Sequence, residues 1–287
     1  MPEINQAKNM TKDNIRDKAH LIHELELNLW EMWSHFGRAQ GCALHDEGDV
    51  MWFETPIPIL PYHVVMKFQA TEHIDQKIDK LVKQFNDRQV PFMWIVHPSA
   101  SPQDLPNRLE ARGLREVEIV TGMTRELTDL PELPPLPENI EIREVIQPDD
   151  ANQPDDASQL FEFAAWRWDV PEAYREQLEI ILEDFRFGQS GSKMHAWQAW
   201  RDGKPVAKTG MCVADKSAGI YAVVTRPEAR RLGLARNLTF TALEKAQKLG
   251  KHLAVLHSTP MAESLYQSLG FEPVVKFRLF ASGEMHI

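Results

Sequence analysis

Hydrophobic positions along the chain change their spacing in a regular way, and these changes predict helices and strands. Near the start, an apolar stripe that includes Leu21, Leu25 and Leu29 predicts a helix over residues 12–38. Shorter apolar and β-branched runs predict strands. The elements expected after that first helix are strands at 49–57 and 63–70, an amphipathic helix at 74–88, a strand at 91–97, a short helix that ends at Gly113 and a strand at 115–127.

The second part of the chain follows a similar order. It begins with a strand at 140–145 and two helical segments at 157–168 and 171–185. The hairpin-favouring pair Asp202-Gly203 then joins two strands. The elements expected here are strands at 193–202, 205–215 and 219–225, a helix at 234–249, a strand at 252–257, a short helix at 262–269 and a last strand at 271–281. Helices and strands interleaved in this way predict an α/β fold.

Two segments far apart in the sequence resemble each other, which indicates an internal repeat. Residues 95–117 and 255–274 both run from a strand through a histidine, small polar residues, a short helix and a glycine to another strand. Between the two parts, residues 128–138 (TDLPELPPLPE) contain four prolines, which fit neither a helix nor an internal strand. We therefore expect a first domain at 1–127, a proline-rich linker at 128–139 and a second domain at 140–287.

The composition is that of a folded protein, and the net charge limits the classes of partner that it is expected to bind. Hydrophobic residues make up 43% of the 287 residues and charged residues 26%. The 32 Lys and Arg are outnumbered by 42 Asp and Glu, so the formal net charge is −10, which argues against nucleic-acid binding. No apolar run is long enough to span a membrane, and the polar N-terminus lacks the apolar core of a signal peptide. Two distant cysteines, Cys42 and Cys212, fit a reducing compartment, so we expect a cytoplasmic protein.

The segment with the clearest chemistry lies at residues 223–238, where a β-branched strand passes into a helix. A helix N-terminus offers unpaired backbone N–H groups and a positive dipole end, which together favour an anion. Gly233 and Ala235 allow a bulky group to approach the backbone closely. Positive charge is also concentrated here, because the segment contains Arg226, Arg230, Arg231 and Arg236. The segment therefore predicts a pyrophosphate site, although a charged helix start with a turn glycine explains the same residues.

The known phosphate-binding motifs GxxxxGK[ST] and GxGxxG are absent, but another motif matches. Arg230-x-x-Gly233-x-Ala235 after a strand resembles the [Q/R]-x-x-G-x-[G/A] motif of the GCN5-related N-acetyltransferase (GNAT) family. The strand at 219–225 resembles the family's fourth strand, which splays from the fifth, and residues 265–271 (LYQSLGF) match the family's LY-x-x-LGF segment. The resemblance covers about residues 140–280. Together with the repeat, it implies an α/β chain of two tandem GNAT-like domains, each a mixed, mostly antiparallel sheet flanked by helices.

The resemblance also implies an activity and a set of site residues. Family members move an acetyl group from acetyl-CoA, and here the acceptor would be a primary amine of a small molecule, so the chain would be an acyl-CoA-dependent N-acyltransferase. Tyr266 matches the tyrosine that protonates the departing thiolate, a task suited to a phenol. Thr259 stands where many members have an asparagine, and its hydroxyl replaces only one of the two amide functions. The remaining cofactor residues implied are Val223, Val224, Thr225, Arg230, Arg231, Leu232, Gly233, Leu234, Ala235 and Arg236.

The base that takes the proton of the amine is left open. His257 ends the strand beside the expected splay, where it would relay a proton or simply pack. Other polar candidates lie in segments expected to border the acceptor, and surface roles explain them equally well: Glu162, Asp169, Glu172 and His195. Four tryptophans cluster in the same region and fit core packing or contact with the acceptor: Trp166, Trp168, Trp197 and Trp200. His20 and His23 lack a third ligand, so no metal site is expected.

The first part lacks the phosphate-binding motif. Residues 67–80, which lead into its amphipathic helix, contain no glycine, and Glu72 and Asp75 there would repel a pyrophosphate. We therefore expect a degenerate GNAT-like domain that binds no CoA and walls off the acceptor site or caps the other sheet. The alternatives to an N-acetyltransferase are a non-catalytic acyl-CoA sensor, a partner-binding module and a transferase that uses a different acyl-CoA. A monomer and a homodimer are both compatible with the sequence.

Overall fold

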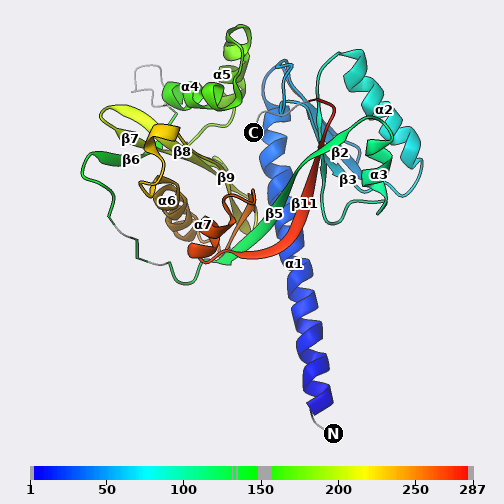
Figure 1. The fold of residues 1–287 in the computed structure, drawn as a ribbon, viewed down its shortest axis with the longest axis horizontal. Helices are drawn as coiled ribbons and strands as arrows, with labels where there is room; N and C mark the ends of the chain where they lie inside the picture. Colours follow the sequence, from blue (N-terminus) through cyan, green and yellow to red (C-terminus); the bar gives the residue numbers. More distant parts are fainter. Residues whose placement is uncertain (1–2, 131, 134, 148–156, 284–287) are drawn as a thin grey trace.

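One continuous β-sheet organises the molecule (Figure 1). The computed structural model describes residues 3–130, 132–133, 135–147 and 157–283, with side chains from residue 17 onward except that of Ala157. Within these residues, eleven strands form a single mixed sheet that helices flank on both faces. The α/β fold expected from the sequence is confirmed.

The strands do not follow one another across the sheet in chain order. They are β1 (Ala43–Asp46), β2 (Val50–Glu54), β3 (Val64–Phe68), β4 (Met93–Val96), β5 (Arg115–Glu126), β6 (Ile140–Val145), β7 (Met194–Arg201), β8 (Lys204–Val213), β9 (Ser217–Thr225), β10 (Leu253–Ser258) and β11 (Glu272–Ala281). Their order in the sheet is β1-β2-β3-β4-β11-β5-β10-β9-β8-β7-β6. The parallel neighbours are β3 with β4 and β9 with β10, and the other neighbours are antiparallel.

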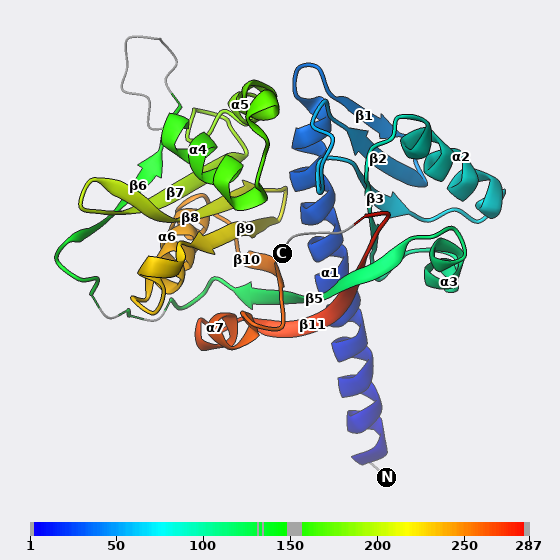
Figure 2. The same ribbon diagram turned by 45° about the horizontal axis from the view of Figure 1, so that its top comes forward.

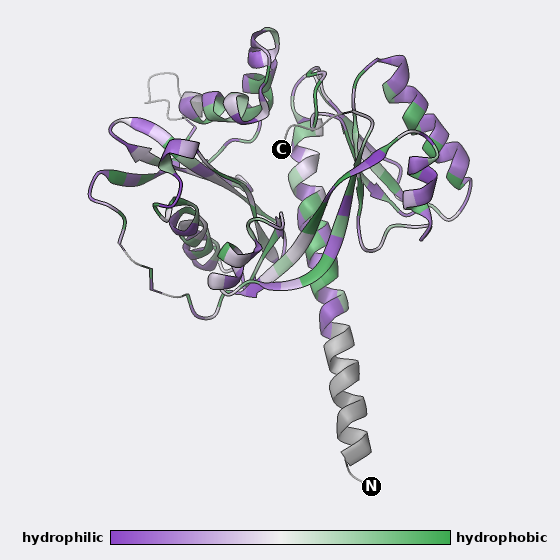
Figure 3. Cartoon of the chain, viewed as in Figure 1, coloured by the Kyte–Doolittle hydropathy of each residue, from purple (hydrophilic) through white to green (hydrophobic). Residues whose placement is uncertain are grey.

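Helices bury one apolar stripe each against this sheet. They are α1 (Glu3–Arg38), α2 (Ile74–Asp87), α3 (Leu105–Glu110), α4 (Ala157–Trp168), α5 (Arg175–Glu183), α6 (Leu234–Lys248) and α7 (Glu263–Ser268). In α2, the residues Ile78, Leu81 and Phe85 recur on one face and are buried, and Figure 3 shows hydrophobic bands alternating with hydrophilic ones along this helix. The amphipathic pattern of the sequence therefore sets which face of the helix packs.

The last strand of each half pairs with a strand of the other half. β5, which comes before the proline-rich segment, pairs with β10, and β11, the last strand of the chain, pairs with β4. β5 and β11 also pair with each other, from Glu272 opposite Thr124 to Ala281 opposite Arg115. Figures 1 and 2 both show the two strands side by side at the centre of the molecule. The expected domains 1–127 and 140–287 therefore share one sheet, and the boundaries between them stay a prediction.

The helix α1 ties the first half to the site-bearing strands of the second. It contacts β1 and β2 in its own half and β8, β9 and β10 in the other. Asn28, with no exposed surface, donates to the carbonyl oxygens of Cys212 and Ser217, both at 3.3 Å. A buried side-chain amide with several partners holds two elements in one register. The long first helix is therefore part of the scaffold of β8 and β9.

The predicted elements agree with the structure apart from their ends and one strand. Asp202 and Gly203 have positive φ values of 52° and 76°, as a two-residue hairpin turn requires. The edge strand β1 was not predicted, because its four residues carry little hydrophobic signal. Two of the linker prolines, Pro131 and Pro134, lie outside the described residues. In the part of the chain that the structure describes, no helix has the length and apolar character needed to cross a membrane.

Candidate functional site

The parallel strands β9 and β10 pair over only part of their length. Their register runs from Ser217 opposite Leu253 to Ile220 opposite Leu256. Beyond that point β9 continues to Thr225 beside β8 alone, while β10 continues to Ser258 beside β5. The strands therefore diverge at their carboxyl ends, as the sequence predicted, and one edge of β9 is left without a neighbouring strand.

A β-bulge marks the start of the diverging part of β9. The register with β8 shifts between Lys208 opposite Val224 and Gly210 opposite Tyr221. Within the bulge, Ala222 has a φ of 51°, a left-handed value that costs free energy in any residue with a Cβ atom. Bulges of this kind redirect the backbone next to binding sites. The strand is therefore bent where the opening begins.

The first turn of α6 presents backbone donors at the same end of the sheet. Gly233 precedes the helix with a φ of 75°, and Arg231 also has a positive φ, 65°. Among the described residues, no acceptor takes the N–H groups of residues 231–236. Because α6 follows β9, these donors lie at the carboxyl end of β9, where the strands diverge. Free donors at a helix N-terminus are suited to a phosphate group.

The arginines of this segment point in different directions. Arg226 stacks on the rings of Trp166 and Phe163, 4.5 and 4.9 Å from their centroids, so its guanidinium belongs to the contact with α4. Arg236 donates to Oγ of Ser268 at 3.1 Å and links α6 to α7. Arg230 and Arg231 have exposed side chains. Two arginines therefore remain close to the free N–H groups with side chains in solvent.

The other predicted residues of this segment contribute backbone more than side chain. Leu234 is buried in the core beneath α6, whereas Leu232 is exposed and Ala235 is half-buried. The hydroxyl of Thr225 is enclosed and has no hydrogen-bond partner in the described part of the chain. The backbone of this stretch, rather than its apolar side chains, is therefore free to meet a ligand.

A cavity of about 300 Å³ occupies the opening between the strands. Tyr221–Val224 of β9 line one side of it, and His257–Thr259 line the other. Tyr266 of α7 also lines the cavity, and burial raises the pKa of its phenol to about 12, so the phenol is protonated at neutral pH. Within the described residues, burial alone acts on this phenol and no hydrogen bond to it is found. A phenol in this setting is able to donate a proton to a group in the cavity.

His257 contributes a neutral imidazole to the same cavity. Its ring lies 4.5 Å from that of Phe277 and 6.4 Å from that of Tyr221. Burial lowers its pKa to about 3, and neither ring nitrogen has a hydrogen-bond partner among the described residues. An imidazole with so low a pKa is a poor general base, although its nitrogens remain able to hydrogen-bond a ligand.

Charged side chains from three distant segments line the wall of the cavity on the α4 side. They are Glu118 of β5, Arg167 of α4 and Lys208 of β8. Burial raises the pKa of Glu118, against the opposing effect of Arg167. Burial, reinforced by Arg167, lowers the pKa of Lys208 to about 8. A carboxyl group with a raised pKa is better suited to accept a proton from an amine than an ordinary surface carboxylate.

The base candidates taken from the sequence, other than His257, do not line this cavity. Glu162 and Glu172 are exposed and pair with Arg175, at 3.6 and 3.0 Å. His195 faces the α6 side of the sheet, where its Nδ1 lies 3.3 Å from Glu144. Asp169 is exposed, with a φ of 49°. The acidic side chain that does line the cavity is Glu118.

One of the four tryptophans reaches the cavity. Trp168 lines it, with the guanidinium of Arg167 above its ring at 4.6 Å. The ring of Trp166 stacks with the guanidinium of Arg226, and that of Trp200 lies 4.7 Å from the guanidinium of Arg143. Trp197 is buried in the core beneath α6. Core packing therefore describes Trp197, whereas Trp166 is 43% exposed.

The first half has a comparable divergence, but its own chain fills it. The parallel strands β3 and β4 pair only at Val64–Met93 and Val65–Trp94. Beyond them, Nε2 of His97 accepts the N–H of Phe68 at 3.2 Å, and Nδ1 of His97 lies 3.0 Å from Glu26. Ser101 also donates its N–H to the carbonyl oxygen of Phe68 at 3.1 Å. Residues 97–101 therefore take the place that the cavity has in the second half.

Comparison with known families agrees with this geometry. Residues 170–283 match the family model described as an acetyltransferase (GNAT) domain. The chain carries a GNAT domain. The matched segment includes the diverging strands, the start of α6 and Tyr266.

Solved structures resemble the chain over most of its length, well beyond the GNAT domain. A GCN5-related N-acetyltransferase from Kribbella flavida superposes with a TM-score of 0.63 at 16% identity, covering 91% of this chain and 97% of that one. A tandem GNAT protein from the clavulanic acid biosynthesis pathway gives 0.55 at 16% identity, covering 86% of each chain. A GCN5-related N-acetyltransferase from Sphaerobacter thermophilus gives 0.58 at 16%, covering 82% of each. A search of curated protein sequences finds no match. At these identities the likeness concerns the fold.

Proposed function

We propose that the chain is an N-acetyltransferase that moves an acetyl group from acetyl-CoA to a primary amine of a small molecule. The observation that carries the proposal is that free N–H groups, an open strand edge and a protonated phenol meet where β9 and β10 diverge. The N–H groups would bind a pyrophosphate, and the strand edge would bind a pantetheine arm. The phenol would protonate a departing thiolate.

The cosubstrate would be held mainly by backbone. The N–H groups of residues 231–236 would take its pyrophosphate, with Arg230 and Arg231 adding positive charge from solvent. The unpaired edge of Val223, Val224 and Thr225 would bond the amides of the pantetheine arm, as an added strand would. The Thr259 hydroxyl lines the cavity from the opposite side. Supporting this placement, Gly233 has no Cβ atom to block the approach.

The transfer would proceed directly from thioester to amine. The acceptor nitrogen forms a bond to the carbonyl carbon, and the carbon–sulfur bond breaks. Glu118 would take one proton from the amine, and Tyr266 would give its phenolic proton to the sulfur, so the products are an amide and a free thiol. A backbone N–H of the diverging β9 would stabilise the negative charge on the carbonyl oxygen. Positioning of the two substrates supplies most of the remaining rate enhancement.

The first half would serve the site as scaffold and wall. Residues 97–101 fill its own divergence, and Asp75 in the first turn of α2 pairs with Arg108 and Arg112, at 2.6 and 2.9 Å. A carboxylate in the first turn of a helix already interacts with its positive dipole end and disfavours the binding of a pyrophosphate there. We propose that the half spanning 1–127 binds no CoA and instead supplies Glu118 and α1 to the cavity in the half spanning 140–287.

Ligand-dependent thermal unfolding followed by a thiol-release assay tests the proposal. A ligand at about 100 times its Kd adds roughly 2.7 kcal/mol, so acetyl-CoA and CoA should each raise the melting temperature by several degrees, while ATP and NADH should not. A panel of primary amines should then release thiol from acetyl-CoA. Stabilisation by CoA without turnover of any amine would favour an acyl-CoA sensor. The absence of any shift would refute the cofactor site.

A further inference from the structure

Lys208 is a largely buried cation for which the described residues offer no carboxylate and no hydrogen-bond acceptor. Its side chain belongs to β8 and is 6% exposed. In the part of the chain that the structure describes, burial and the charge of Arg167 act on its ammonium, no carboxylate or hydrogen bond does, and the centroid of the Phe163 ring lies 5.9 Å from Nζ. A buried ammonium without compensation is costly, so its presence calls for a ligand group that pairs with it.

The charged side chains that line the larger cavity together with Lys208 leave positive charge in excess. Arg167 comes from α4 and lies over the ring of Trp168, and Glu118 comes from β5. Tyr221, from β9, already donates its hydroxyl to Asn28 at 2.8 Å. Two cations thus face one carboxylate in the lining of the cavity. A ligand with one carboxylate and one amine would place the carboxylate against the two cations and the amine against Glu118. With the amine neutral, as the transfer requires, the summed charge of the ligand and these three side chains is zero.

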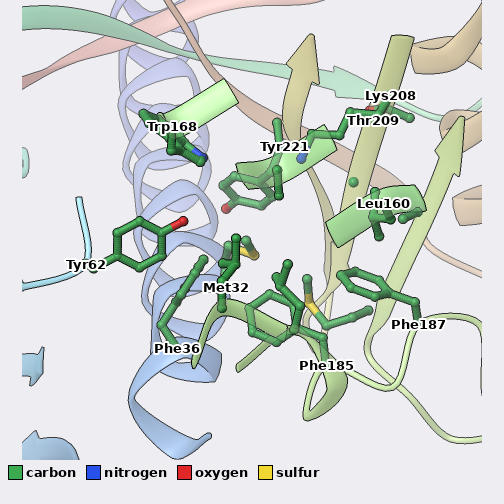
Figure 4. Close-up of a pocket in the computed structure, with 17 residues that line it drawn as sticks. Met32, Phe36, Tyr62, Leu160, Trp168, Phe185, Phe187, Lys208, Thr209 and Tyr221 are labelled. Atoms are coloured by element: carbon green, nitrogen blue, oxygen red, sulfur yellow. The ribbon is translucent and has the colours of Figure 1, made fainter. Parts of the chain in front are cut away.

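A second, apolar cavity opens beside Lys208. It has a volume of about 80 Å³ and shares Trp168, Lys208, Tyr221 and Ala222 with the larger cavity. Figure 4 shows the Lys208 side chain extending toward Tyr221, with Phe36, Phe185 and Phe187 around the other end of the space. Its volume is about half of the ~150 Å³ cavity that holds benzene, so a branched aliphatic group fits it better than an aromatic ring.

We propose, on the basis of the N-acetyltransferase function above, that the acceptor is an aliphatic α-amino acid whose carboxylate binds Lys208 and Arg167. The α-carbon of such a molecule sits where the two cavities join. Its carboxylate meets the two cations, its aliphatic side chain enters the apolar cavity, and its amine faces Glu118 and the opening between β9 and β10. The transfer itself is the one described above, in which a carbon–nitrogen bond forms and a carbon–sulfur bond breaks.

The test compares two amines that differ only in the carboxylate. L-leucine and isoamylamine carry the same aliphatic group, and each is measured by thiol release with the wild-type protein and with Lys208→Met. Methionine keeps the apolar stem and removes the charge, and Lys204→Met on the exposed end of β8 serves as the matched control. We expect Lys208→Met to lower kcat/KM for leucine about 10- to 100-fold, the range for a hydrogen bond to a charged group, and to leave that for isoamylamine within about twofold. Because each amine is compared with itself, their different basicities cancel.

Equal losses for both amines, or no loss for leucine, would overturn the proposal. A calorimetric titration with L-leucine in the presence of CoA tests the carboxylate site independently of acetyl transfer. If the wild-type protein binds leucine, Lys208→Met does not, and no thiol is released, then the carboxylate site stands and the acetyl transfer falls. If isoamylamine releases thiol while leucine neither binds nor reacts, then the transfer stands and the carboxylate site falls.

Discussion

The hydroxyl of Tyr221 donates a hydrogen bond of 2.8 Å to Oδ1 of Asn28, and thereby joins the candidate site to the first helix. The amide nitrogen of Asn28 reaches the carbonyl oxygens of Cys212 and Ser217 on the other side. Gly219 makes this approach possible, because a Cβ atom there would lie 1.9 Å from Oδ1 of Asn28. The bent strand that lines the cavity is therefore held in place by a residue nearly two hundred positions earlier.

Asn28→Ala should destabilise the protein by about 2–4 kcal/mol, because it leaves the Tyr221 hydroxyl without its acceptor and removes the amide donor from the carbonyl groups of Cys212 and Ser217. Urea unfolding measures the change, and Leu27→Ala on the exposed face of the same helix should cost far less. Gly219→Ala should also be destabilising, and less so in the Asn28→Ala background, where the clash with Asn28 is gone and only the contact of 2.5 Å with the Tyr221 ring remains. Additive losses in the double variant would show that the two positions do not interact.

Tyr266→Phe should lower kcat of acetyl transfer about 100-fold and leave the Kd of CoA within about twofold, since only the proton donor is removed. The wild-type phenol has its pKa raised to about 12, so the loss should be the same from pH 6 to pH 9. Steady-state kinetics and calorimetry provide the two numbers. An unchanged kcat would remove Tyr266 from the proposed mechanism.

Arg226 and Arg231 should behave differently although both belong to the same basic segment. Arg231→Ala should weaken CoA binding about threefold to tenfold at low salt, because its exposed side chain lies near the free N–H groups. Arg226→Ala should leave the Kd of CoA unchanged and lower stability by about 1 kcal/mol, through the lost stacking on Phe163 and Trp166. Calorimetric titration of both variants decides the matter, and equal effects on binding would contradict this assignment.

Lys208→Met should stabilise the protein, since it removes a buried charge that no carboxylate of the described residues compensates. The pKa falls from 10.5 to about 8, which corresponds to a cost of up to about 3 kcal/mol below pH 8. Between pH 8 and 10.5 the unfolded lysine binds more protons than the folded one, so wild-type stability should rise with pH and the gain of the variant should shrink. Thermal unfolding at pH 7 and pH 10 tests both statements. A variant less stable than the wild type at pH 7 would mean that Lys208 has an unseen stabilising role.

The half from residue 140 onward should not fold alone as a soluble monomer. Without β5, both β10 and β11 lose a neighbour and expose unpaired edges, which favours aggregation. Co-expression with residues 1–139 should restore a soluble complex. Cooperative unfolding of an isolated, monomeric 140–287 fragment would instead support two independent domains.

The local parts of the site were predictable because they depend on neighbours in the sequence. A strand that ends at Thr225, the glycine at 233 and the helix that follows specify an anion-binding helix start within about ten residues. The same holds for Tyr266 in its short helix and for the Asp202-Gly203 turn. Arg226 shows the limit of this reasoning, since its side chain turns to the rings of α4 and away from the rest of the segment.

Neighbouring residues along the chain are enough to specify the order of helices and strands, the absence of the phosphate-binding motif from the first part and the donor-rich start of α6, because short-range spacing and backbone geometry control these features. Long-range contacts are needed to place β5 beside β10, to bring Glu118, Arg167 and Lys208 to one cavity and to fill the other divergence with residues 97–101. Strand pairing between distant segments depends on which edges meet during folding, and no local pattern encodes that choice. The charges of the proposed acceptor site come from three such segments, so their meeting could not be predicted from the residues around any one of them.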